Sequence, residues 1–261
     1  MLFDLLRMGS MSGDARLTVI MSFLVRVFVI ICVLPVHEYA HALVANKLGD
    51  NTARLKGRLT LSPLAHIDPI GALMTLLCGF GYAKAVPVNI RNFRKKRKEP
   101  IGNIYYMGSD TVFDAGHAKR CMAAVAAAGP ASNLIMAFIS MVLMRVAGVA
   151  FGAYLAGNND ATISLLAYIV VTFFSFCASI NINLAVFNLL PIPPLDGSRL
   201  ISVILPDKIY FSIMKYERYI MIAILVLLFT GILTTPLSFL SDLVYRAFDS
   251  IVSLPFRLIF A

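Results

Sequence analysis

The sequence predicts an all-α polytopic membrane protein with about four transmembrane helices, a re-entrant segment and a short β-hairpin. Two observations predict this fold class. Of the 261 residues, 59% are hydrophobic and only 14% are charged, a balance that an ordinary globular domain does not have. The apolar residues also gather in long runs separated by basic loops, as expected for helices that cross a bilayer.

The predicted crossings follow from the apolar runs. The second, third and fourth crossings cover residues 121–146, 163–190 and 219–233. The first begins at Leu17 or at Val27, because Arg26 would have to extend to the membrane surface, and it ends at Lys47. Even the shorter alternative is ~31 Å long, which is enough to cross. Pro35 removes a backbone donor inside this helix, so we expect a kink there.

Other stretches are not expected to cross the membrane. Residues 67–82 are apolar but interrupted by prolines and glycines, which favours a re-entrant or interfacial segment. Residues 54–62 alternate polar and apolar side chains around Gly57, as a short β-hairpin does. The two ends, 1–16 and 238–261, are amphipathic, and the first is expected to lie at a membrane interface.

We interpret residues 1–261 as a single domain with a core at 27–207, a basic loop at 84–120, and a C-terminal span and tail at 219–261. The four cysteines stand apart without a CxxC pair. They are therefore expected to be reduced packing residues and not a disulfide framework or a thiolate zinc site. No cleavable signal peptide is expected, because the first apolar run carries the motif described below.

The net charge of +9 is explained by membrane orientation rather than by nucleic-acid binding. Basic residues gather in the loops after the first crossing, before the second and after the third, including the run 94–98. If residues 67–82 re-enter, these loops all lie on one side, which the positive-inside rule makes cytoplasmic. The run 94–98 is then a solvated juxtamembrane face. The expected partner is therefore a lipid bilayer, with no nucleic acid.

The pentad HEYAH, residues 37–41, lies at the end of the first apolar run. Residues four apart share one face of a helix, so His37 and His41 can bind a single ion. Glu38 lies beside them and can act as a general base toward water. Chance matches to HxxxH are common, but two histidines and a carboxylate at membrane depth are costly unless they have a function. The pentad therefore predicts a zinc-hydrolase site within the membrane.

A catalytic zinc needs a third protein ligand, and Asp196 is the best candidate. It lies in the turn PIPPLDG after the third crossing, followed by Gly197 to relieve the backbone. The alternative from the residues alone is that Asp196 caps the helix that begins at Ser198. Under the topology above, the pentad, the stretch GPASN at 129–133 and Asp196 lie at one depth on the basic side.

Three motifs in this order resemble the site-2 protease family of intramembrane zinc metalloproteases. They are HExxH in the first crossing, GPxxN opening the second, and NxxPxxxxDG closing the third, with Asn188, Pro191, Asp196 and Gly197 in the last. LSPLAHIDPIG at 61–71 and FGYAKAVPVN at 80–89 are similar to the compact bacterial or archaeal branch of that family. The resemblance covers residues 27–207, and the chain shows no PDZ or CBS domain.

The resemblance implies that His37, His41 and Asp196 bind one zinc ion per chain and that Glu38 is the catalytic base. It also implies a catalytic role for Asn188, which steadies the substrate or the oxyanion. The implied function is hydrolysis of peptide bonds in or near transmembrane segments of substrate proteins, that is, regulated intramembrane proteolysis. The implied location is the prokaryotic plasma membrane, with the active site toward the cytoplasm.

Two further residues are candidates for substrate binding. Asn133 closes the GPxxN motif, with the alternative that its side chain joins the second and third crossings by hydrogen bonds. His66 could line the cleft, but a hydrogen bond within its own loop is the favoured alternative. An exposed edge at 58–61 could receive an extended substrate strand, although a hairpin that packs on the bilayer surface is favoured there.

Three other functions fit part of the pattern. A di-iron membrane desaturase also uses HxxxH, but such sites draw on many histidines and this chain has four. A metal or proton transporter would use the same polar residues at membrane depth, but it predicts paired half-repeats, and the sequence has no internal repeat. A catalytically inactive relative would act as a binding scaffold, but every residue that the chemistry requires is present.

Overall fold

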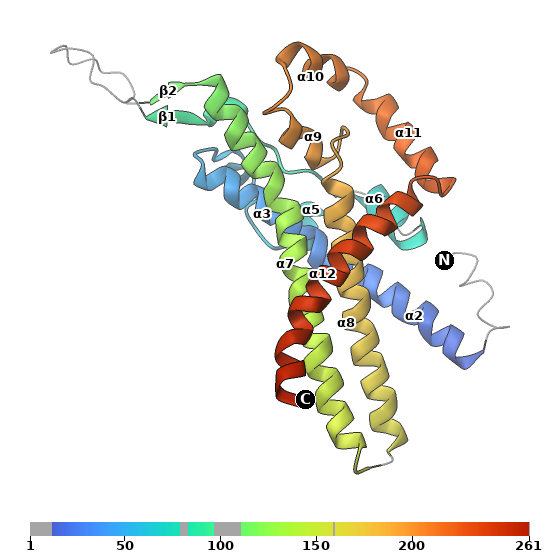
Figure 1. Cartoon of the computed structure of the whole chain (residues 1–261). Coiled ribbons are helices and arrows are strands. Elements are labelled where there is room, and N and C mark those ends of the chain that lie inside the picture. Colours follow the sequence, from blue (N-terminus) through green and yellow to red (C-terminus); the bar gives the residue numbers. More distant parts are fainter. Residues whose placement is uncertain (1–11, 79–82, 97–110, 159, 261) are drawn as a thin grey trace.

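A computed structural model describes residues 12–78, 83–96, 111–158 and 160–260, and these are mostly helical (Figure 1). Two long helices, α7 (Ala115–Leu155) and α8 (Ala161–Asn188), run antiparallel along each other at the centre of the molecule. Three described helical stretches are long and apolar enough to cross a membrane: Ala15–Lys47, Ala115–Leu155 and Ala161–Asn188. The prediction of a helical integral membrane protein is confirmed.

The first long helix is built from three consecutive parts: α2 (Gly13–Phe28), a π-helical turn η2 (Val29–Val33) and α3 (Leu34–Lys47). The Ser12 hydroxyl caps its start by accepting a hydrogen bond from the Ala15 N–H at 3.4 Å. The helix therefore begins before both predicted starting points, Leu17 and Val27. A capping serine defines the start of the helix more closely than the apolar run does.

The π-helical turn lies directly before Pro35, the residue predicted to kink this helix. The Leu34 N–H donates to the Val29 carbonyl, five residues back along the chain. Pro35 has no N–H and its ring crowds the preceding turn, and a widened turn accommodates both effects. The helical defect that the sequence predicts next to the pentad therefore takes the form of a π turn.

The β-hairpin predicted at 54–62 is wrong. These residues form the end of the short helix α4 (Thr52–Leu55), a turn, and a loop that leads to α5 (Pro63–His66). Gly57 has a φ of +67°, so it does reverse the chain. The alternation of polar and apolar residues around it was too short to separate a strand from a helical turn followed by a loop.

Side chains close the loop between α4 and α5. The Arg58 guanidinium donates to the Ala65 carbonyl. The His66 Nε2 atom lies 2.8 Å from the Thr60 carbonyl oxygen. The exposed edge at 58–61, which was the less favoured alternative for these residues, is therefore absent, because they form a loop that is bonded to itself and to α5.

The helix α6 (Pro69–Cys78) occupies most of the predicted re-entrant stretch, and residues 79–82 of that stretch lie outside the described residues. A helix of 10 residues is ~15 Å long and cannot cross a bilayer. The Arg26 guanidinium donates to the Leu76 carbonyl at 3.2 Å. Arg26 therefore reaches a polar partner on α6, which holds this short helix against α2.

Two short strands, β1 (Arg94–Lys96) and β2 (Thr111–Phe113), pair antiparallel within the basic loop. They are the strands found among the described residues, and no strand was predicted there. Residues 97–110, which join them and include the end of the basic run, lie outside the described residues. Figure 1 shows the strand pair beside the start of α7.

The segment before β1 is anchored by an aromatic side chain. The 3-10 turn η3 (Ile90–Asn92) precedes Phe93, which is fully buried. Phe93 packs in one hydrophobic cluster with Ala45 of α3 and with Ala118 and Cys121 of α7. The polar loop is therefore fixed to the same two helices that carry the pentad and the GPxxN motif.

A second hydrophobic cluster joins α7 and α8 to the C-terminal helix α12 (Thr234–Phe260). Met141 of α7, Ile182 of α8 and Val252 of α12 are buried in it. The amphipathic tail predicted at 238–261 therefore corresponds to most of α12, and its apolar face covers the central helix pair (Figure 1).

Three short helices connect α8 to α12: α9 (Asp196–Ile201), α10 (Asp207–Met214) and α11 (Glu217–Phe229). Figure 1 shows α10 and α11 arching away from α7. The predicted fourth crossing falls on α11, whose 13 residues measure ~20 Å against a hydrocarbon core of ~30 Å. Among the described helices, α11 therefore does not meet the length of a membrane span.

Candidate metal centre

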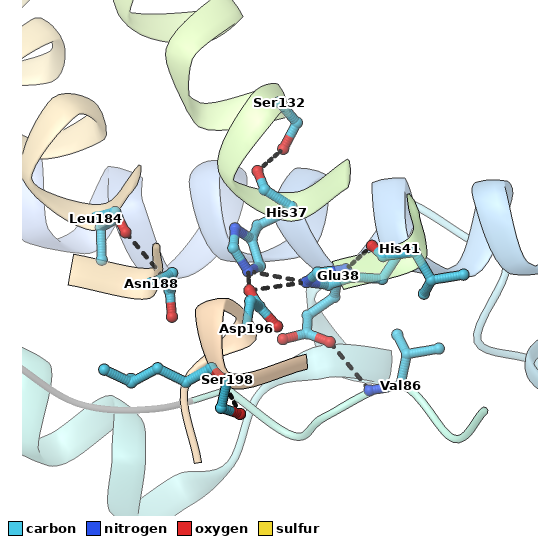
Figure 2. A network of polar contacts seen from close by, with 12 residues as sticks. His37, Glu38, His41, Val86, Ser132, Leu184, Asn188, Asp196 and Ser198 are labelled. Atoms are coloured by element: carbon cyan, nitrogen blue, oxygen red, sulfur yellow. Dashed lines mark hydrogen bonds and ion pairs between the residues drawn. The ribbon is translucent and has the colours of Figure 1, made fainter. Parts of the chain in front are cut away.

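The two histidines of the pentad lie one turn apart on α3 and meet an aspartate from α9. The Nε2 atoms of His37 and His41 are 3.1 Å apart. Each of them lies 3.3 Å from the Oδ2 atom of Asp196 (Figure 2). His37 and His41 are each 6% exposed. Folding therefore brings together the three side chains that the sequence singled out as metal ligands.

The spacing of the three atoms fits a zinc ion. Ligand atoms ~2.0–2.1 Å from a tetrahedral zinc lie about 3.3–3.4 Å from one another, and the three distances here are 3.1, 3.3 and 3.3 Å. Two imidazole nitrogens and one carboxylate oxygen are a common zinc donor set and leave a fourth position for water. Three acceptors this close would repel one another without a cation between them.

A hydrogen bond at the Nδ1 atom of His41 determines that its Nε2 atom is the one available to bind a metal. The Nδ1 atom of His41 lies 2.7 Å from the Val125 carbonyl oxygen on α7. An Nδ1–H donor there leaves the Nε2 lone pair pointing at the shared site. The Nδ1 atom of His37 is buried and has no partner among the described residues.

Asp196 reaches the histidines because it is the first residue of α9 and not its cap. The cap residue is Leu195, and the Ser198 N–H donates to the Leu195 carbonyl. The alternative in which Asp196 caps this helix is therefore not what the structure shows.

Gly197 is needed because a side chain at this position does not fit between α9 and the end of α8. A Cβ at this position would collide with the carbonyl oxygens of Leu189 and Leu190 at the end of α8. Gly197 does not have a positive φ, so the expectation that it relieves backbone strain is wrong. Its missing side chain lets the start of α9 fold back onto α8, and this close contact aims Asp196 at α3.

Gly129 of the GPxxN motif is a site residue whose role the sequence did not reveal. A Cβ there would lie 2.6 Å from the Nε2 atom of His37 and closer still to the Nε2 atom of His41. The backbone of α7 therefore borders the metal centre directly. The motif drew attention to this stretch, but only the packing of α7 on α3 gives the glycine its purpose.

Glu38 lies beside the three ligand atoms and is 8% exposed. Its Oε2 atom accepts a hydrogen bond from the Val86 N–H at 3.0 Å (Figure 2). Val86 belongs to the stretch FGYAKAVPVN, where the sequence indicated a family resemblance but no contact with the base. A carboxylate held next to two imidazoles and a metal-type site is suited to taking a proton from water.

Asn188 is the last residue of α8, and its Nδ2 atom donates to the Leu184 carbonyl at 3.0 Å (Figure 2). An amide nitrogen carries two hydrogens, so this bond leaves one N–H and the Oδ1 atom for another partner. The side chain is half-buried. The structure therefore keeps Asn188 at the helix end that leads to Asp196, with donor capacity remaining.

The two candidate substrate-binding residues are both buried. His66 is 1% exposed and bonds its own loop through Thr60, as in the alternative favoured for it. Asn133 is 1% exposed, and neither of its side-chain polar atoms has a partner among the described residues. The hydrogen bond between the second and third crossings that was the alternative for Asn133 is therefore not found in the described structure.

A buried carboxylate that the sequence did not single out lies just past the end of α3. Asp50 is fully buried and accepts hydrogen bonds from the Thr52 N–H and hydroxyl, the Asn89 N–H and the Asn92 amide. Burial raises the pKa of Asp50, but these four donors outweigh it, so its pKa lies below the ordinary 3.8. No spacing rule in the sequence pairs these residues.

An HExxH helix completed by an aspartate from a later helix end, inside an apolar bundle, defines a membrane-embedded zinc metalloprotease. The chain belongs to peptidase family M50, which matches residues 25–229. This is the site-2 protease family that the three motifs indicated, and zinc is its cofactor.

Two curated relatives support the same assignment. The "Putative zinc metalloprotease YwhC" of Bacillus subtilis (strain 168) is 39% identical over 197 residues, which cover 74% of this chain and 75% of the relative. The "Putative zinc metalloprotease Rip2" of Mycolicibacterium smegmatis is 28% identical over 216 residues, which cover 82% of this chain and 68% of the relative. No solved structure matches the chain.

Proposed function

We propose that this chain hydrolyses peptide bonds in or near transmembrane segments of membrane-protein substrates. The observation that carries the proposal is the meeting of His37, His41 and Asp196 around one point, with the Glu38 carboxylate beside it, inside a bundle of apolar helices. The ligands are nearly buried, so a substrate must come to them at the depth of the bundle.

In this mechanism His37, His41 and Asp196 are the zinc ligands, one ion per chain. A zinc ion bound there supplies Lewis-acid chemistry, which acidifies water toward a pKa of ~7 and polarises the scissile carbonyl. Glu38 takes the proton from the attacking water. It then gives that proton to the nitrogen of the leaving amine. The Val86 N–H holds one oxygen of Glu38, and the other oxygen remains to carry the proton.

Asn188 is proposed to donate to the oxyanion that forms at the scissile carbonyl. Its bond to Leu184 fixes the carboxamide and leaves one N–H available. One well-placed donor of this kind is worth ~2–4 kcal/mol in other oxyanion holes. Asn133 and His66 are proposed to act by shaping the bundle around the site, since both are buried.

We also propose that the active site faces the cytoplasm of a prokaryotic plasma membrane. In the described part of the chain, β1, β2, α9 and α10 lie at the end of the central helix pair where α8 leads to Asp196 (Figure 1), and the positive-inside rule makes a basic end cytoplasmic. Residues 67–82 are proposed to re-enter and α11 to form a fourth, tilted or partial crossing. The chain is proposed to act as one domain with its core at 27–207.

The test is cleavage of a membrane-spanning peptide by the purified zinc-loaded protein. Glu38→Gln should keep one zinc per chain and lose cleavage, because an amide cannot accept the proton. Glu217→Gln, the same change at the start of α11, should leave cleavage unchanged. Cleavage that survives Glu38→Gln would overturn the proposal. Metal or proton transport that persists in Glu38→Gln vesicles, without cleavage in the unsubstituted protein, would instead support the transporter alternative.

A further inference from the structure

Residues 84–89, which we call the strap, run past the active site without helix or strand structure. The strap contacts three separate parts of the protein through backbone N–H groups. We propose that the strap positions the general base, with the Val86 N–H fixing the Glu38 carboxylate in the orientation that catalysis requires. This inference rests on the proposed function and adds Val86 to it as a positioning residue.

The three contacts are spaced along the strap. The Lys84 N–H donates to the His66 carbonyl at 2.8 Å. The Val86 N–H donates to the Glu38 Oε2 atom at 3.0 Å. The Asn89 N–H donates to the Asp50 Oδ2 atom at 2.7 Å. The middle contact is therefore held between two outer ones, and the strap can neither slide nor lift away from Glu38 without breaking them.

Both outer contacts are made to rigid parts of the structure. His66 is 1% exposed, and its ring is bonded to the Thr60 carbonyl. Asp50 is fully buried and also receives hydrogen bonds from Thr52 and Asn92. Buried groups that are held by hydrogen bonds move little. The anchors therefore hold the Val86 N–H at a fixed distance from α3.

The sequence of the strap suits this role. Residues two apart in an extended chain present their N–H groups on the same side, and those of Lys84 and Val86 both point into the protein. Ala85 between them is exposed. Pro87 biases the residue before it toward extended conformations. Pro87 thus keeps Val86 in the geometry in which its N–H meets Glu38.

A single oriented donor matters because a glutamate side chain is long and has several rotamers. A hydrogen bond to one carboxylate oxygen selects one rotamer and leaves the second oxygen facing the metal centre. Misplacing a catalytic group by about 1 Å costs up to 10²-fold in rate. The strap therefore raises kcat by holding Glu38 in place, while zinc binding and substrate affinity do not depend on it.

The activity test compares two proline substitutions in the zinc-loaded full-length protein. Val86→Pro removes the N–H that bonds Glu38 and should lower kcat about 10- to 100-fold, with KM and zinc content unchanged. Ala85→Pro inserts the same ring one residue away, at an exposed residue whose N–H makes none of the three strap contacts, and should keep kcat within about threefold. Val86→Ala shortens the side chain, keeps the N–H and should also retain kcat.

Hydrogen exchange provides a measurement that does not depend on activity or on Val86→Pro folding. The Val86 amide should exchange slowly in the unsubstituted protein. Glu38→Ala removes the acceptor, so peptides covering 84–89 should gain about one fast-exchanging deuteron, assigned to Val86 and not to Lys84. Unchanged exchange in Glu38→Ala, or equal kcat in folded Val86→Pro and Ala85→Pro, would overturn the inference.

These outcomes separate the inference from the proposed function. If the unsubstituted protein cleaves and Glu38→Gln does not, the function stands, and the strap is then judged by Val86→Pro and by exchange. If the unsubstituted protein cleaves no substrate, the function fails, while the exchange experiment still reports whether Val86 holds Glu38.

Discussion

Gly129 of α7 lies so close to His37 of α3 that a methyl group on the glycine would come within 2.6 Å of the His37 Nε2 atom. The same methyl group would collide with the Nε2 atom of His41. The space shared by the metal ligands therefore exists because α7 has no side chain at this point. The backbone of one helix forms a wall of a site whose ligands come from two others.

Gly129→Ala should therefore abolish stoichiometric zinc binding, with affinity falling by at least ~10- to 100-fold, because the methyl group displaces both imidazoles. Metal analysis of the purified protein measures this. Gly148 and Gly152 lie on the same helix with no atom within 4 Å of an added Cβ. Their alanine variants should keep zinc. One zinc per chain in Gly129→Ala would contradict this account of the site.

His37→Ala and Asp196→Ala should each reduce zinc to well below one per chain. Each variant leaves only two of the three converging ligand atoms, and catalytic zinc sites use three protein ligands. His117→Ala is the matched control, because His117 lies on α7 and contacts Cys121 instead of the metal centre. Inductively coupled plasma mass spectrometry provides the measurement. Full zinc content in either ligand variant would rule out that ligand.

Asn188→Leu should keep zinc and lower kcat by about 10²- to 10³-fold, since leucine has a similar size but no donor for the oxyanion. Steady-state cleavage of a membrane-spanning peptide measures the change. Asn183→Leu is the control, because Asn183 lies on the same helix and is exposed. Equal loss of activity in both variants would point to a general effect on α8.

Asp50→Asn should destabilise the protein by ~1–3 kcal/mol at pH 7. The amide that replaces the carboxylate brings its own N–H group toward the Thr52, Asn89 and Asn92 donors. Reversible unfolding in detergent micelles measures the free energy of unfolding. Asp242→Asn, on the exposed side of α12, should leave stability unchanged.

The stability contributed by Asp50 should also depend on pH with a definite sign. Its pKa in the folded state lies below the ordinary 3.8, so the unfolded state binds a proton more readily. The contribution is present in full above the ordinary pKa and is lost as pH falls through the lower folded value. The stability difference between the unsubstituted protein and Asp50→Asn should therefore shrink below pH 4. A constant difference down to pH 2 would contradict this.

The contributions of Arg145 of α7 and Asp249 of α12 to the free energy of unfolding should be coupled. Their Nη2 and Oδ1 atoms are 2.5 Å apart, and Arg145 lies within a candidate membrane span. Removing one partner leaves a charge without its partner in apolar surroundings. Arg145→Met and Asp249→Leu should therefore each cost more than the double variant does.

The double-mutant cycle for this pair should give a coupling of about 1 kcal/mol or more. Unfolding in micelles, followed by loss of helicity, provides the four free energies. Arg246→Met, on the exposed side of α12, is the control and should not couple to Arg145. Additive effects of the two single variants would show that the ion pair does not help hold α12 on α7.

Several features could be predicted because their signal is local. The pentad is a helical motif whose histidines are four residues apart. At the end near the site, the long apolar runs mark α7 to within six residues and α8 to within two. Pro35 indicated the helical defect that appears as η2. In each case, the residues that determine the structure are neighbours along the chain, so periodicity and composition report them.

Other features could not be predicted because they depend on contacts between distant residues. The bond from Val86 to Glu38 joins residues 48 apart, and the bond from Asn89 to Asp50 joins residues 39 apart. No local pattern reports such pairings.

The sequence by itself determined the chemistry of this protein: two histidines, a glutamate and an aspartate in motifs that suit zinc and water. Only the tertiary structure decided that these groups meet, that Gly129 and Gly197 make room for them, and that the strap reaches Glu38. The physical reason is that a side chain's chemical nature is encoded at one position. Its neighbours in space depend on how α3, α7 and α9 pack together.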